Sequence, residues 1–119
     1  MKFLRSHIAA KDASFLVIFM HHPPFFVGSN WIDKIGLKAG KAEFLRLIQH
    51  PKIKLVVSGH VHQESQKEIG SVKLVTSPST CVQFKPYSDV FALGNSNPGY
   101  RLITLWENGE FSTEVVRLT

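Results

Sequence analysis

Two pairs of histidines have the type and spacing that a metal site needs. His60 and His62 follow the compact apolar run 54–58, and the adjacent pair His21–His22 follows the apolar run 15–20. On a flat strand, residues at i and i+2 share a face, so we expect the first pair to aim both imidazoles at one point. Imidazole suits zinc, copper, iron and nickel. Two strands that each end in histidine therefore predict a metal site. The alternative is ordinary surface or core packing of each pair.

The elements that must bring the two pairs together are two strands and the helix between them. Residues 15–20 and 54–58 are short apolar runs, and the first is apolar throughout, which is typical of a strand covered on both faces. Residues 40–49 carry an apolar stripe at helical spacing, whereas residues 25–38 predict a long loop. The order strand, helix, strand indicates a βαβ unit with parallel strands and a right-handed crossover. Ligands collect at the carboxyl ends of such strands, which is where both histidine pairs lie.

The remainder of the chain predicts one helix and several β-hairpins. A short helix is expected over residues 2–10. Gly70–Ser71 separates one pair of strands, and Asn108–Gly109, a type I′ turn signal, separates another. The strands expected in this half are 64–69, 72–77, 81–84, 101–106 and 111–117. No linker or repeat divides the sequence, so we expect a single domain of mixed α/β (α+β) class over residues 1–119.

The composition excludes several classes of protein. With 44% hydrophobic residues, the 119-residue chain has enough apolar surface to fold. Its net charge of +5 comes from scattered basic residues, so neither a nucleic-acid partner nor a membrane surface is expected. The single cysteine, Cys81, excludes an internal disulfide and is expected to be a small buried apolar residue. No apolar run reaches the roughly 18 residues of a membrane span, and the N-terminus lacks a signal-peptide pattern. We therefore expect a soluble cytoplasmic protein.

Carboxylates are scarce around the histidines. Asp33 and Glu64 are the nearest in sequence, and neither stands beside another candidate ligand at a strand end. Three histidines and a water can hold one zinc ion. A hydrolytic site with two metals needs ligands for both ions and usually a carboxylate between them, so a complete binuclear site cannot be assembled from these residues. His7 and His50 stand alone and are expected to have structural or solvent roles. Aromatic residues such as Phe84 are expected to anchor the core or a loop rather than to stack on bases.

Several stretches taken together resemble the C-terminal half of the calcineurin-like metallophosphoesterases, and most closely the bacterial class III 3′,5′-cyclic AMP phosphodiesterases. The resemblance extends from about residue 15 to 117. The stretches that carry it are Met20–Pro24, Gly28–Asp33, Ser58–Glu64, Ser77–Pro86 and Asn97–Arg101. Gly-His-x-His marks only the superfamily, whereas the last two stretches point to the cyclic-nucleotide group.

The resemblance implies a fold, ligands and a substrate. The fold would be the C-terminal half of a four-layer αββα sandwich. His21 and His60 would bind one divalent metal, His62 would bind a second, and His22 would lie near the substrate phosphate. The metals would be iron, manganese or zinc. The substrate would be a cyclic nucleotide, with other phosphodiesters such as glycerophosphodiesters as the alternative. A non-catalytic module that binds metal or nucleotide is a further alternative.

The sequence also departs from the family pattern. The family begins with Asp-x-His, Gly-Asp and Gly-Asn-His-Asp/Glu motifs, which supply the remaining ligands and a histidine for the leaving group, and none of them is present. No catalytic residue is therefore assigned. We expect a partial domain that is inactive or nearly inactive alone. We also expect it to self-associate, because a half sandwich exposes apolar surface.

Overall fold

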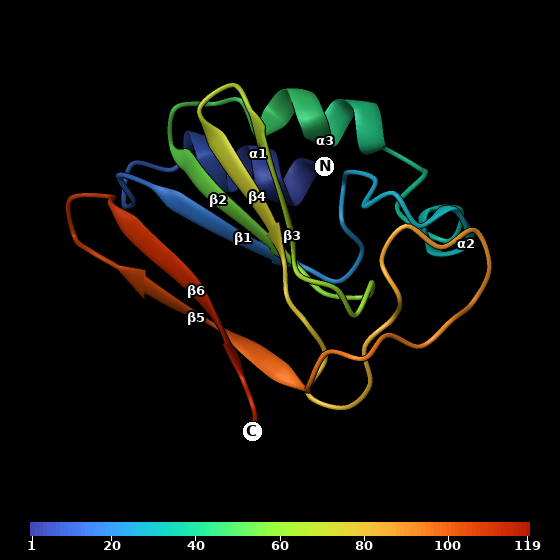
Figure 1. Ribbon diagram of the computed structural model, residues 1–119. Coiled ribbons are helices and arrows are strands. Elements are labelled where there is room, and N and C mark those ends of the chain that lie inside the picture. Colours follow the sequence, from blue (N-terminus) through green and yellow to red (C-terminus); the bar gives the residue numbers. More distant parts are fainter.

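The computed structural model describes all 119 residues and contains three helices and six strands (Figure 1). The helices are α1 (Lys2–Ala9), α2 (Asn30–Asp33) and α3 (Lys41–Leu47). The strands are β1 (Leu16–Met20), β2 (Ile53–Ser58), β3 (Ser65–Ile69), β4 (Val72–Thr76), β5 (Gly99–Leu105) and β6 (Phe111–Arg117). The mixed α/β class predicted from the sequence is confirmed. No helix is long and apolar enough to cross a membrane.

The main sheet has the strand order β1-β2-β4-β3. Strands β1, β2 and β4 are parallel, and β3 pairs antiparallel with β4 as a hairpin. The predicted βαβ unit, in which α3 connects parallel strands β1 and β2, is confirmed, as are both predicted hairpins. The sequence pattern did not indicate that β4 lies beside β2 and becomes an inner strand of the sheet.

Helices and the β5–β6 hairpin cover opposite faces of the main sheet (Figure 1). On the helical face, Phe44 and Ile48 of the α3 region pack with Val56 and Leu74 in the larger core cluster. On the other face, a smaller cluster of Leu55, Val57 and Val75 packs against Ile103 and Phe111 of the hairpin. The layers are therefore helix, sheet and hairpin, which are three of the four layers that the resemblance implies.

A bulge in β2 assigns its side chains to these two faces. The register with β1 pairs Leu16 with Ile53 but Val17 with Leu55, so Lys54 is skipped. Without this extra residue, Ile53 and Leu55 would share a face because side chains alternate along a strand. With it, Ile53 packs in the helical cluster and Leu55 in the hairpin cluster.

Strand β1 differs from the expectation of a strand covered on both faces. It lies at the edge of the sheet, and none of its residues is fully buried. Phe19 is 66% exposed. A mostly apolar groove of about 420 Å³ runs between β1 and the start of the chain, lined in part by Phe3, Leu4 and Ile18. Ile18 still packs against the helical cluster and Val17 against the hairpin cluster, but no strand pairs with the outer side of β1.

Four local predictions were wrong. The predicted loop 25–38 contains the short helix α2. The predicted strand 81–84 is reduced to one bridge between Phe84 and Leu93, and Cys81 is exposed rather than buried. The turn between β5 and β6 is not type I′, because of its residues only Gly109 has a positive φ, of 85°. Its amide donates to the carbonyl of Trp106 over 2.9 Å, as in a type I turn that ends in a left-handed glycine.

Candidate metal centre

Three parallel strands end level with one another beside the histidines. The register aligns Met20 with Ser58, and Ser58 with Thr76, so β1, β2 and β4 finish at one edge. Just beyond that edge, the Gly59 amide donates to the His21 carbonyl over 3.1 Å. This bond continues the ladder for one residue and carries the two histidine segments side by side, as expected at the carboxyl ends of parallel strands.

A strained turn then directs His60 inward. The amide of Val61 donates to the carbonyl of Gly59 over 2.7 Å, and φ of His60 is 67°. A three-residue turn with a positive φ at its centre is a rare and strained conformation. Such strain persists where surrounding packing enforces it, and here Val61 is 1% exposed in the core.

The turn completes a cluster of three histidines. His21, His22 and His60 each offer one ring nitrogen, and the three nitrogens lie within 4.8 Å of one another. The ring centroids of His22 and His60 are 4.3 Å apart, and those of His21 and His60 are 5.2 Å apart. Two elements of the chain, each at a strand end, therefore converge on one point.

The chemistry of this cluster fits a divalent metal. The Nε2 atom of His60 is buried and has no hydrogen-bond partner, which is costly for a polar atom unless something else binds it. Burial lowers the pKa of His60 below its ordinary value, and so do the nearby His22, His21 and His62. The neutral imidazole that results has the free lone pair that a metal ligand requires.

His62 does not join this cluster. Its Nδ1 atom lies 2.9 Å from the carbonyl oxygen of Val82, and its ring stacks on Phe84 at 4.2 Å and 4°. The expectation that His60 and His62 share a strand face was wrong. Both residues have positive φ, of 67° and 48° respectively, and the buried Val61 between them turns their side chains to different neighbours.

The carboxylates nearest in sequence are engaged elsewhere. Asp33 accepts the amides of Val27 and Gly28 at 3.0 and 2.9 Å, so it closes its own loop. Glu64 forms an ion pair with Arg117 at 3.3 Å. No carboxylate belongs to the histidine cluster.

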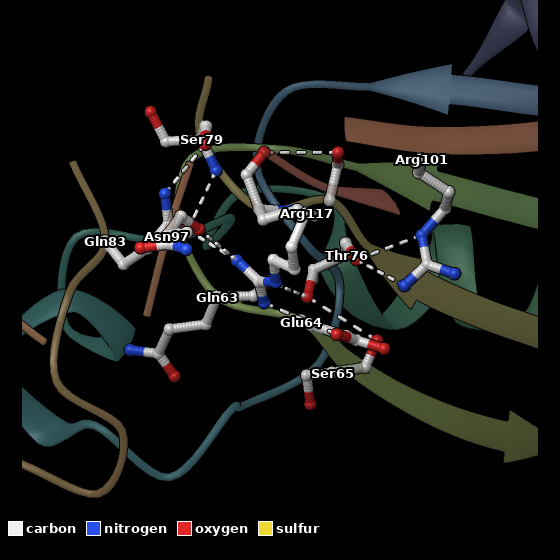
Figure 2. Close-up of polar contacts among 11 residues, drawn as sticks. Gln63, Glu64, Ser65, Thr76, Ser79, Gln83, Asn97, Arg101 and Arg117 are labelled. Atoms are coloured by element: carbon white, nitrogen blue, oxygen red, sulfur yellow. Dashed lines mark hydrogen bonds and ion pairs between the residues drawn. The ribbon is translucent and has the colours of Figure 1, made fainter. Parts of the chain in front are cut away.

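A polar network that sequence reasoning missed supports the strand ends (Figure 2). Arg101 of β5 donates from Nε and Nη2 to the carbonyl of Thr76, at 3.2 and 2.8 Å. The Thr76 hydroxyl in turn donates to the carbonyl of Gln63 over 2.7 Å. This chain of contacts links the hairpin to the segment that follows the histidine turn. Arginine spacing in a strand does not reveal such a contact, because it depends on how the two sheets pack.

Comparisons with known proteins agree with this geometry. The family model described as calcineurin-like phosphoesterase matches residues 1–64, which include the three clustered histidines. The 3′,5′-cyclic adenosine monophosphate phosphodiesterase CpdA of Vibrio vulnificus is 43% identical over 115 residues, and that of Pseudomonas aeruginosa is 40% identical. Each alignment covers 97% of this chain and 42% of the relative. A 3′,5′-cyclic-nucleotide phosphodiesterase of Nostoc is 39% identical over 86% of this chain and 38% of its own length.

The chain thus spans about two fifths of the length of these relatives, covering 42% of the first two and 38% of the third. The family match itself covers more than half of the chain, 64 of 119 residues. On this evidence, the chain belongs to the calcineurin-like phosphoesterase family.

Proposed function

We propose that this chain supplies the histidine side of the metal centre of a phosphodiester hydrolase that acts on 3′,5′-cyclic nucleotides. The observation that carries the proposal is the convergence of three imidazole nitrogens. The Nε2 atom of His60, one of the three residues, is also buried without a partner. His21 and His60 are the ligands that the family resemblance implies. His22 contributes the third nitrogen of the cluster, so it either completes the metal site or meets the substrate phosphate bound there.

The substrate class rests on the relatives. Several proteins that align with nearly the whole chain are named cyclic AMP phosphodiesterases. Other phosphodiesters, such as glycerophosphodiesters, are the alternative, because a shared fold does not determine the substrate.

The chain's own residues would hold and orient the bound groups. A divalent metal, when bound, polarises a phosphoryl oxygen and lowers the pKa of bound water. The lowered pKa of His60 favours its neutral form, and the strained turn holds its ring beside those of His21 and His22. These side chains suffice for one ion but bring no carboxylate to it. We therefore expect the 119-residue chain alone to bind metal and to hydrolyse phosphodiesters slowly or not at all.

Calorimetric titration with zinc tests the metal site. The wild-type chain is expected to bind one zinc ion, and His60→Ala is expected to weaken binding by at least about tenfold, since it removes a direct ligand. His50→Ala is the matched control, because His50 lies outside the cluster and its ring accepts only the amide of Lys52. Equal zinc affinity in all three proteins would contradict the proposal.

Substrate assays test the second part. With manganese present, 3′,5′-cyclic AMP is expected to bind the metal-loaded chain more tightly than glycerophosphodiesters of similar size. Hydrolysis of bis-p-nitrophenyl phosphate is expected to stay near the buffer rate. Preference for glycerophosphodiesters would favour the alternative substrate class, and robust turnover would show that the chain is complete as a catalyst.

A further inference from the structure

The ring of His62 is fixed in two independent ways. Its Nδ1 atom lies 2.9 Å from the carbonyl oxygen of Val82, and this contact fixes the rotation of the ring about the Cβ–Cγ bond. Its face stacks on Phe84 with a centroid distance of 4.2 Å and an interplanar angle of 4°. The Phe84 amide also donates to the His62 carbonyl over 3.2 Å, so the same residue holds both the backbone and the side chain of His62.

These contacts determine the tautomer of His62. A backbone carbonyl can only accept a hydrogen bond, so Nδ1 must carry the proton. In the neutral ring, Nε2 is then deprotonated and keeps its lone pair. Nε2 has no partner within the protein, and it is not among the buried unpartnered atoms. The ring thus presents a single, defined acceptor atom to solvent or to a ligand.

Phe84 is held rigidly enough to act as a support. The rings of Trp31 and Phe91 contact it edge to face, with centroid distances of 5.0 and 5.6 Å. Its backbone pairs with Leu93 across the one bridge of the 77–98 segment. Edge-to-face contacts of this kind add to the stability that burial provides, so Trp31 of α2 and the nearby 91–93 segment hold one aromatic face against His62.

We propose that Phe84 is a positioning residue, which together with the Val82 carbonyl keeps His62 in the Nδ1-protonated tautomer with Nε2 available to a metal ion. The role of Nε2 rests on the proposed function, whereas the tautomer and its dependence on Phe84 do not. Support of this kind, in which a backbone carbonyl fixes the other ring nitrogen, is typical of histidines that bind metals.

Long-range ¹H–¹⁵N NMR spectra of the metal-free chain test the proposal. At about pH 8, an ordinary histidine is neutral and its two nitrogens report the tautomer directly. Wild-type His62 is expected to show a protonated Nδ1 and a deprotonated Nε2. Phe84→Leu retains apolar volume but removes the flat face, so it is expected to give a mixture of tautomers. Phe84→Tyr keeps the ring and is expected to restore the wild-type pattern.

Phe3→Ala is the matched control, because Phe3 is 78% exposed and its ring contacts His7 rather than Phe84 or His62. It is expected to leave the tautomer unchanged. A wild-type His62 protonated at Nε2, or a Phe84→Leu protein with an unchanged tautomer, would overturn the proposal. Amide spectra of each variant establish that it is folded, and the wild-type spectrum decides the tautomer without any variant.

A zinc titration followed by the same spectra separates this proposal from the proposed function. If zinc shifts the Nε2 resonance of His62, the histidine is a ligand in addition to being positioned. If zinc leaves it unmoved while the tautomers behave as expected, the positioning by Phe84 stands and the metal role of His62 fails.

Discussion

Replacing Arg101 by methionine is expected to destabilise the protein and to loosen the segment behind the histidine turn. The Arg101 side chain is half-buried between the hairpin and the main sheet. It donates twice to the carbonyl of Thr76, which is fully buried, and once to the hydroxyl of Thr113 over 2.9 Å. Burial lowers the pKa of Arg101, and Glu64 opposes this shift. The guanidinium stays charged at neutral pH, because no condition of practical use deprotonates it.

The size of the effect follows from these contacts. Hydrogen bonds from a charged donor contribute about 1.5–3 kcal/mol, and methionine retains most of the apolar stem but none of the donors. We therefore expect a loss of about 2–3 kcal/mol, since the two donors share one carbonyl acceptor. With about 2.1 cal/mol/K of unfolding entropy per residue, a 119-residue chain loses about 4 °C of Tm per kcal/mol, which gives a decrease of about 8–12 °C.

Urea unfolding and thermal melting measure this change. Arg101→Lys is expected to fall between wild type and Arg101→Met, because lysine keeps the charge but cannot form the forked contact. Arg46→Met is the control, since Arg46 is exposed on α3. A loss below about 0.5 kcal/mol for Arg101→Met, the range of ordinary surface substitutions, would refute the reasoning. Faster hydrogen exchange at the Val61 amide would show that the loosening reaches the turn.

Three further changes have defined outcomes. Strand β1 is an uncharged edge strand with an exposed Phe19, so we expect the chain to self-associate at concentrations on the order of 10 µM. Phe19→Lys is expected to shift it toward monomer in sedimentation velocity, and a monomeric wild-type chain would contradict this expectation. Gly99→Ala would place a methyl carbon 2.7 Å from a β6 carbonyl oxygen, so a loss of about 1–3 kcal/mol is expected in urea unfolding. Asp33→Asn removes one of the two oxygens that accept the Val27 and Gly28 amides, so faster hydrogen exchange of one of these amides is expected in NMR. If both amides exchange as slowly as in the wild type, the carboxylate does not hold the loop.

The convergence of His21 and His60 could be anticipated because it depends on local patterns. Two apolar runs, a helical stripe between them and histidines just after each run are enough to predict a βαβ unit with both histidine segments at one edge. The inner position of β4 could not be anticipated in this way. Its sequence is compatible with an isolated hairpin, and only packing against β2 makes it the third strand to end at that edge.

The separation of His60 from His62 lay beyond sequence reasoning for a different reason. Positive φ values are uncommon outside glycine, so the alternating pattern Gly-His-Val-His favours continued strand geometry. The structure instead places Val61 in the core and gives both histidines left-handed backbones. Two features stabilise these backbone conformations. Val61 is buried in the core, and the ring of His62 stacks on Phe84, which lies in a later segment.

One turn therefore carries two histidines that are supported separately. His60 is held by the strand ends and the buried Val61, whereas His62 is held by the Val82 carbonyl and the face of Phe84. We expect a change in the 82–84 segment to free the ring of His62 while leaving the cluster of His21, His22 and His60 intact. We expect a change at the strand ends to move His60 and the turn together. If His60 and His62 bind the same metal centre, the bound metal couples the two supports, so variants at both supports are expected to have non-additive effects on metal affinity.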